Sequence, residues 1–255
     1  MDADLLKRYL EFYQDLGITT LYKRESARER IPETPLTAVR GSADSAVPVA
    51  QPSESGPYHE FLAPSGESLL NILEDIGDCH RCRLHEERNK IVFGVGSEKS
   101  ALVFVGEGPG ADEDAQGIPF VGRAGQLLTQ MIENTAKKEG IPLQRSDVYI
   151  CNVVKCRPPG NRTPEPQEME ICGQFLFRQL SAIQPKAICA LGGTAARVLT
   201  GHQEGVTKMR GKWFQWNHIP VLVTYHPSYL LRAYNQDAKR EAWDDLKRLF
   251  HFVYD

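Results

Sequence analysis

Short apolar runs alternate with amphipathic stretches along most of this chain. An uninterrupted apolar run of this length is typical of a buried strand, whereas apolar residues that recur every three or four positions are typical of a helix. The pattern predicts helices over 68–79, 124–140, 164–183, 194–201 and 237–254, and strands over 101–106, 148–154, 186–192 and 219–225. Strands that alternate with helices form a parallel sheet covered on both faces. We therefore expect an α/β fold of three layers, with a central mostly parallel four-stranded sheet and helices on both faces.

The first 65 residues follow a different pattern. Residues 1–24 place apolar side chains on one helical stripe before Gly17 interrupts it, which predicts an accessory amphipathic helix. Residues 25–65 are rich in proline, serine, glycine, alanine and charge and show no period, as in a flexible linker. We expect three parts: an accessory helix over 1–24, a linker over 25–65 and a folded domain over 66–255.

Composition narrows the class of protein. The chain has 255 residues, of which 41% are hydrophobic, enough for one sizeable α/β core. No apolar run is long enough for a membrane span, and the N-terminus lacks a cleavable signal pattern, so we expect a cytoplasmic protein. The formal net charge is −3, which excludes a global basic field and leaves only local patches for binding nucleic acid.

Three segments follow predicted strands and carry unusual residues: 106–125, 152–159 and 225–232. In parallel sheets, ligand groups gather in the loops beyond the carboxyl ends of the strands. The first segment is glycine-rich, but it has neither the G-K-[ST] nor the G-x-G-x-x-G pattern of a phosphate-binding loop. A nucleotide-binding or redox protein is therefore disfavoured.

Acidic residues set the chemistry of the first segment. Glu107, at the end of a predicted strand, suits a carboxylate that faces water or a developing positive charge, although it would also serve to cap the next turn. We interpret Asp112, Glu113 and Asp114 as a solvated acidic surface.

The six cysteines fall into two groups. In a reducing compartment they are thiols or metal ligands rather than disulfides. Cys151 and Cys189 lie inside predicted strands and are interpreted as core residues. The other four suit a cage of four thiolates, and their spacing leaves zinc and an iron–sulfur cluster as alternatives: Cys79, Cys82, Cys156 and Cys172.

The segment "TYHPSYLLR" carries the third set of candidates. His226 directly follows a predicted strand, and Pro227 and Ser228 begin a helix whose free N–H groups would favour an anion. A lone histidine is usually structural, but this position favours a functional role. The apolar residues Leu230 and Leu231 suit either the edge of a core or a wedge that enters a base stack.

In combination, these motifs resemble one family. The stretches "GEGPGADEDAQGIPFVGRAG", "CNVVKCRPPGNRTP" and "YHPSYLLR", preceded by Cys79-x-x-Cys82, closely resemble the family 4 uracil-DNA glycosylases, in order from about residue 67 to 252. The resemblance implies an enzyme of base excision repair that flips uracil out of single- or double-stranded DNA and hydrolyses its N-glycosidic bond. It also implies a [4Fe–4S] cluster held by Cys79, Cys82, Cys156 and Cys172.

The same resemblance implies a role for each site residue. Glu107 and His226 would be catalytic, the first orienting water or offsetting positive charge on the sugar, the second stabilising the departing base. The base would be held by Gly108, Phe120, Asn152 and His226, with Phe120 stacking on uracil and Asn152 reading its edge. The DNA would be contacted by Ser228, Leu230, Leu231 and Arg232, with Ser228 holding phosphate and one of the leucines filling the vacated stack.

Two features of the sequence bear on the choice of base and on turnover. Gly108 stands where the family commonly has alanine, which would loosen the pocket loop and blur the choice of base. The segment after Asn152 lacks the basic insertion of related proteins that trap their product covalently, so we expect turnover.

The alternative is a catalytically idle DNA-binding module that kept the cluster. We expect a monomer whose N-terminal helix docks on a protein partner or on the domain itself.

Overall fold

The computed structural model describes residues 66–232 and 235–255, so the predicted N-terminal helix (1–24) and linker (25–65) lie outside the described residues. The described part contains a mixed six-stranded sheet with the order β1-β3-β2-β4-β6-β5. Four neighbouring strands in its centre are parallel: β3 (Tyr149–Asn152), β2 (Leu102–Gly106), β4 (Ala187–Leu191) and β6 (Ile219–Thr224). These are the strands that the apolar runs predict, and the α/β class is confirmed.

The predicted count of four strands is wrong, because an antiparallel strand lies at each edge. β1 (Val95–Gly96) pairs with β3, and β5 (Trp213–Trp216) pairs with β6. β1 is only two residues long and therefore leaves no periodic pattern in the sequence. β5 joins β6 through Asn217 and His218, whose φ angles of 42° and 69° are those of a tight hairpin turn.

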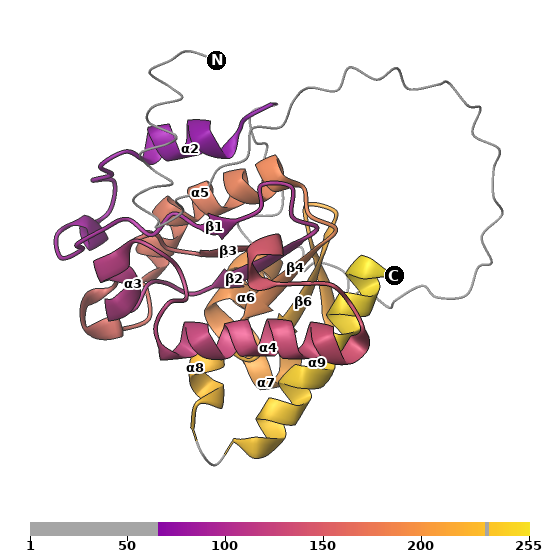
Figure 1. Ribbon diagram of the computed structural model, residues 1–255. Helices are drawn as coiled ribbons and strands as arrows, with labels where there is room; N and C mark the ends of the chain where they lie inside the picture. Colours follow the sequence, from indigo (N-terminus) through magenta and orange to yellow (C-terminus); the bar gives the residue numbers. More distant parts are fainter. Residues whose placement is uncertain (1–65, 233–234) are drawn as a thin grey trace, which may run out of the picture. The chain divides into compact units, whose positions relative to one another are not determined.

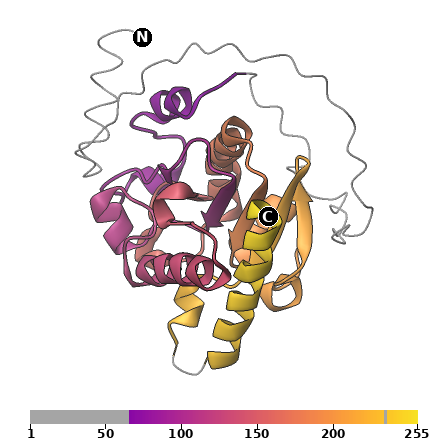
Figure 2. The ribbon, with the colours of Figure 1, turned by 45° about the vertical axis from the view of Figure 1, so that its right-hand side comes forward.

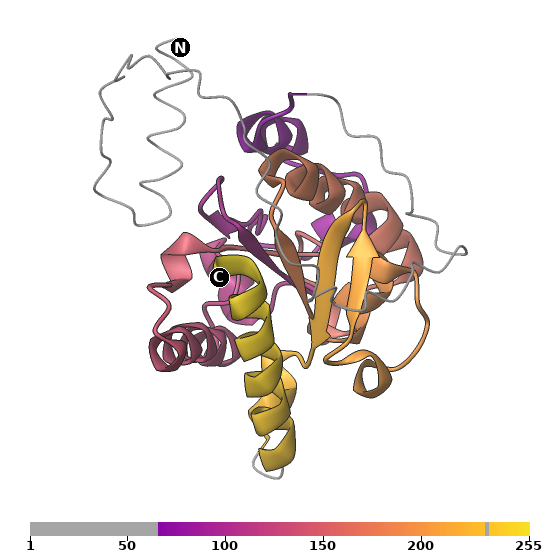
Figure 3. The same cartoon turned by 90° about the vertical axis from the view of Figure 1, so that its right-hand side faces the viewer.

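Helices cover both faces of the sheet, as predicted (Figures 1 and 3). One face is covered by α5 (Pro166–Ile183) and α6 (Gly193–Thr200), and α2 (Leu69–Ile76) packs against α5; the apolar residues of all three share a core cluster with alternate residues of the central strands. On the other face lie α4 (Arg123–Glu139) and α9 (Gln236–Tyr254), which pack against each other. β2, β3 and β4 are buried throughout because each of their faces meets helices.

Three further helices are short. They are α3 (Ala111–Gln116), α7 (Val206–Met209) and α8 (Pro227–Leu230). The sequence predicts the start of α8 at Pro227, whereas α3 lies within the segment interpreted as a loop. α8 and the first turns of α9 extend beyond the sheet beside α4 (Figures 1 and 2). Among the described residues, no helix has the length and apolar content that crossing a membrane requires.

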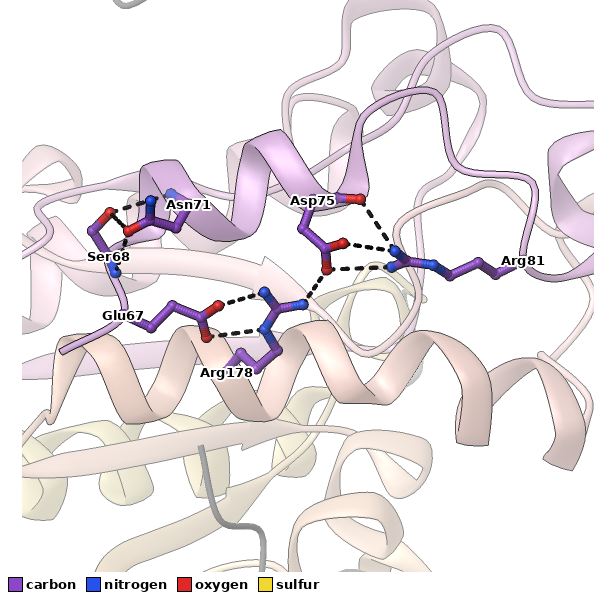
Figure 4. A network of polar contacts seen from close by, with 6 residues as sticks. All are labelled: Glu67, Ser68, Asn71, Asp75, Arg81 and Arg178. Carbon is purple, nitrogen blue, oxygen red and sulfur yellow. Dashed lines mark hydrogen bonds and ion pairs between the residues drawn. The ribbon is translucent and has the colours of Figure 1, made fainter. Parts of the chain in front are cut away.

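A network of ion pairs fastens α2 to α5 (Figure 4). The guanidinium of Arg178 in α5 donates to both carboxylate oxygens of Glu67 and to Asp75, and Asp75 also pairs with Arg81 at 2.7 Å. Hydrogen bonds from Arg81 and Arg178 hold the pKa of Asp75 below its usual value. Since Arg81 lies between Cys79 and Cys82, the network also fixes the segment that carries these two cysteines.

Candidate active site

The three unusual segments meet at one edge of the sheet. Because β2, β3, β4 and β6 are parallel, their carboxyl ends lie along the same edge, as the strand pattern predicts. A pocket of about 210 Å³ opens there. Its lining comes from all three segments and from residues next to them: Glu107, Gly108, Pro109, Gly110, Glu113, Phe120, Ala124, Asn152, Pro158, Asn161, Arg162, His226 and Ser228.

Asn152, the last residue of β3, lies at the base of the pocket. Its side chain is 1% exposed, and its Oδ1 atom has no hydrogen-bond partner among the described residues. The ammonium group of Lys155, which is fully buried, donates to the Asn152 carbonyl oxygen at 2.8 Å and to Gln179 at 2.6 Å. A buried acceptor without a donor is costly. The arrangement therefore offers a ligand an acceptor on a fixed backbone.

Glu107 continues from the end of β2 into the pocket. Its backbone carbonyl accepts from Val154 N–H at 3.2 Å, which extends the pairing of the two strands by one step. Its carboxylate accepts a hydrogen bond from the hydroxyl of Thr194, a buried residue in the first turn of α6. The carboxylate is thus held by a second element and is half-buried in the pocket wall.

His226 lies between β6 and α8, opposite these residues. Its Nδ1 accepts from the backbone N–H of Ser228 at 3.2 Å and lies 2.7 Å from the Ser228 hydroxyl. Burial lowers the pKa of His226 to about 4, and the charge of Glu113 acts in the opposite direction. The ring is therefore neutral at pH 7, and an Nδ1 that accepts leaves the proton on Nε2. His226 presents an N–H donor without a positive charge.

Phe120 lies against both the histidine and the asparagine. Its ring centroid is 5.6 Å from that of His226, and the side chain is 6% exposed. A Cβ on Gly106 would come within 2.4 Å of Asn152 Oδ1 and 2.5 Å of the Phe120 ring. Glycine at this position therefore lets both side chains approach the end of β2.

The interpretation of the acidic run as solvated surface is wrong for two of its three residues. Asp112 is exposed as expected. Glu113 lines the pocket, and Asp114 is fully buried, where it accepts from the backbone and side-chain N–H groups of Asn89. The sequence interpretation missed α3. In a helix with Gly110 as its N-cap, successive acidic side chains point in different directions, so neighbouring acids differ in exposure.

Gly108 lies in close packing. A Cβ built on it would be 2.8 Å from the Val154 side chain, nearer than real Cβ contacts come. Alanine at this position would need Val154 to shift. The sequence interpretation, in which glycine loosens the loop, does not take this close contact with Val154 into account.

The segment around α8 shows which of its residues are accessible. Leu230 is 1% exposed and packs in a small cluster with Tyr225 and residues of α9, whereas Leu231 is 37% exposed. The guanidinium of Arg232 lies 5.9 Å from the Tyr229 ring centroid. The Ser228 side chain is exposed, but its backbone N–H, expected to be free for an anion, donates to His226.

The four cysteines of the predicted cage lie close enough to influence one another. All are free thiols, Cys156 and Cys172 are buried, and Cys79 and Cys82 pack against the same core cluster. Burial, opposed by Arg88, raises the pKa of Cys156 to about 11, and burial, opposed by Lys155, raises that of Cys172 to about 12; the charges of neighbouring cysteines contribute to both increases. Within residues 66–232 and 235–255, no three acidic, histidine or cysteine side chains converge as ligands of one metal ion.

Two N–H donors also face these sulfur atoms. Arg88 lies 3.6 Å from the Sγ of Cys156 and donates to the Cys79 carbonyl, and the backbone N–H of Lys155 donates to the Sγ of Cys172 at 3.2 Å. N–H groups aimed at sulfur suit thiolate ligands. Cys151 and Cys189 are fully buried in strands, as expected of core residues.

Comparison with known proteins gives the family. Residues 93–247 match the family described as the Uracil DNA glycosylase superfamily. The chain is 44% identical over 190 residues to the "Type-4 uracil-DNA glycosylase" of Thermotoga maritima, which covers 73% of this chain and 96% of the relative. It is 43% identical over 191 residues to the protein of the same name from Archaeoglobus fulgidus, covering 72% and 92%. The chain therefore belongs to the type-4 uracil-DNA glycosylases.

Proposed function

We propose that this protein flips a uracil nucleotide out of DNA and hydrolyses the bond between base and sugar, leaving an abasic site. Family membership supports uracil excision and DNA as the substrate. The observation that carries the proposal is that one pocket is lined by a buried acceptor without a donor among the described residues and by a neutral histidine donor. They are the buried acceptor Asn152 Oδ1 and the neutral Nε2–H donor of His226.

Asn152 reads the base in this proposal. Its Oδ1 accepts from uracil N3–H, and its amide NH₂ donates to O4. The bond from Lys155 Nζ to the Asn152 carbonyl supports this role, because it fixes the backbone from which the amide extends. Phe120 stacks on the base, and Gly108 lines the slot beside it.

His226 and Glu107 act on the breaking bond. As uracil leaves, negative charge develops on its O2, and the Nε2–H of His226 donates to that oxygen. A neutral donor suits this step because the proton stays on the imidazole. The Glu107 carboxylate, oriented by Thr194, faces the positive charge that develops on the sugar or holds the attacking water.

The DNA backbone meets the segment around α8. Ser228 and Arg232 contact phosphate, and Leu231 fills the space that the flipped base vacates. Of the two leucines, the exposed Leu231 is the candidate for this wedge, since Leu230 is buried in the domain.

The cofactor of this proposal is a [4Fe–4S] cluster held by Cys79, Cys82, Cys156 and Cys172. The N–H groups of Arg88 and Lys155 at their sulfurs support it, because such donors stabilise thiolate ligands. When bound, the cluster cross-links the segment after α2 with the segment after β3 and with α5.

Residues 66–255 form the catalytic domain, and residues 1–65 are an accessory helix and linker. The coverage of the Thermotoga maritima protein supports this division, since a 190-residue match includes 96% of that enzyme. We further propose a monomer in the cytoplasm that acts on uracil in either single- or double-stranded DNA, with the N-terminal helix docked on a partner or on the domain.

Uracil release tests the proposal. The protein is incubated with an oligonucleotide that holds one uracil, and alkali then cleaves the strand at any abasic site. We expect cleavage at the uracil position alone, with cytosine and thymine oligonucleotides left intact. Binding without release would instead support the catalytically idle module, which the convergence of Glu107, Phe120, Asn152 and His226 in one pocket disfavours.

A further inference from the structure

Phe120 has an unusual backbone conformation. Its φ angle is 55°, in the left-handed region that residues with side chains rarely adopt. The residue is buried, and its ring forms part of the pocket wall next to His226. Strained conformations of this kind persist only where surrounding groups hold them, and they concentrate at functional sites.

Glu113 holds the two peptide groups that follow Phe120. Its Oε1 accepts from the N–H groups of Val121 and Gly122, both at 2.9 Å, and its Oε2 accepts from Gly110 N–H at 3.1 Å. Gly110 and Gly122 are the N-cap residues of α3 and α4. One carboxylate therefore joins the starts of two helices across the loop that carries Phe120.

Arg145 holds the peptide group that precedes Phe120. This residue, in the 3₁₀ turn Arg145–Asp147, donates through Nη2 to the Pro119 carbonyl at 2.8 Å. Its Nη1 donates to the Thr129 hydroxyl at 2.9 Å, which anchors the guanidinium to α4. Gly125 completes the packing, because a Cβ there would lie 1.8 Å from the Phe120 carbonyl oxygen.

We propose that Glu113 and Arg145 are positioning residues that hold Phe120 in its strained conformation at the pocket wall before a base arrives. The inference rests on the proposed function, in which Phe120 stacks on uracil. Hydrogen bonds to ionised groups are stronger than those between neutral groups, and here they fix the peptide groups on both sides of one residue. The stacking surface is thereby preorganised, so that binding the base need not order the loop.

The competing explanation is that Glu113 only caps α3. Capping predicts lost stability that is independent of the Phe120 ring, whereas positioning predicts an effect on excision that requires the ring. Glu113→Gln is the informative change. Three backbone N–H groups donate to the two carboxylate oxygens of Glu113, whereas a glutamine amide has only one acceptor oxygen. Asp112→Asn is the matched control, because it removes the same charge from the exposed neighbouring residue.

The measurement is single-turnover uracil excision at saturating enzyme, with thermal unfolding recorded for each variant. We expect Glu113→Gln to slow excision about 10- to 100-fold, the usual effect of a misplaced group, and Asp112→Asn to stay within about twofold. Arg145→Lys, which keeps the charge but loses the fork, should slow excision about tenfold. Arg145 holds the peptide group on the other side of Phe120, so Arg145→Lys tests the proposal even if Glu113→Gln does not fold.

A double-mutant cycle with Phe120→Ala separates the explanations. If Glu113 acts through the ring, Glu113→Gln should change the rate by less than about threefold once the ring is absent. An equal loss with and without the ring, or a rate within about twofold of wild type for Arg145→Lys and for any folded Glu113→Gln, would overturn the inference. A wild-type protein that releases no uracil would instead overturn the proposed function.

Discussion

The backbone N–H of Ser228 donates to Nδ1 of His226 at 3.2 Å, so the neutral imidazole carries its proton on Nε2. The sequence order His226-Pro227-Ser228 produces this contact locally, because His226 is the N-cap residue of α8 and its ring accepts from the helix's second residue. One hydrogen bond therefore selects the tautomer in which the histidine can donate into the pocket.

Replacing His226 should reduce excision without reducing DNA binding. If its Nε2–H stabilises the departing uracil anion, His226→Ala should slow single-turnover excision by about 10²–10³-fold, the usual effect of losing one preorganised donor. His218→Asn is a suitable control, since His218 lies in the hairpin turn between β5 and β6 at a positive φ that asparagine tolerates. A parallel loss of DNA affinity would make His226 a phosphate contact or a structural residue.

The charge state of His226 gives a second prediction. Burial lowers its pKa from the usual 6.5 to about 4, so the ring should stay neutral down to about pH 5. The unfolded chain takes up this proton near pH 6.5 and the folded chain only near 4, so stability should fall as pH drops through that window. Nitrogen NMR of the ring, assigned by its loss in His226→Asn, checks both the tautomer and the titration. Protonation with a midpoint near 6.5 would contradict the burial of this ring.

The sequence predicts what depends on long apolar runs and on residues directly after them. The four parallel strands follow from their apolar runs, and the meeting of Glu107, Asn152 and His226 follows from the parallel order of those strands. Roles fixed by short elements or by distant partners were missed. Glu113 joins two helix starts, and a run of acids does not reveal which of them turns inward.

The same limit applies around α8. Leu230 and Leu231 are chemically alike and adjacent, so no pattern separates them, and only their packing shows that one is buried and the other exposed. Arg145 is distant in sequence from Phe120, and its bond to the Pro119 carbonyl depends on where the turn after α4 places it.

The cluster proposal predicts the metal content. Protein purified without oxygen should be brown and hold about four irons per chain, because four cysteine ligands suit a [4Fe–4S] cluster. Cys156→Ala should lower the iron content and the thermal unfolding temperature, since a cross-link between the segment after β3 and the segment after α2 is lost. Cys189→Ala, a change inside a buried strand, should leave the iron content intact. A colourless protein with one zinc ion would exclude the cluster.

Asn152 gives the sharpest prediction, because the proposed function assigns the distinction between uracil and cytosine to this residue. Its amide has one acceptor and one donor on the side chain, which match uracil N3–H and O4, whereas cytosine presents an unprotonated N3 and an N4–H₂ group. Each buried group left facing the wrong partner costs about 1–3 kcal/mol. Discrimination therefore depends on Oδ1, the atom that lacks a donor among the residues the structure describes.

Asn152→Asp should therefore weaken uracil excision strongly and permit slow release of cytosine, since a carboxylate accepts from N4–H₂ but offers no donor to O4. The measurement is single-turnover excision from two oligonucleotides that differ only in holding uracil or cytosine at one position. Asn161→Asp is the matched control, because Asn161 also lines the pocket but its side-chain oxygen accepts from Arg157 at 2.8 Å. A wild-type uracil rate in Asn152→Asp would show that this residue does not read the base, and the unpartnered oxygen at the end of β3 would then need another donor.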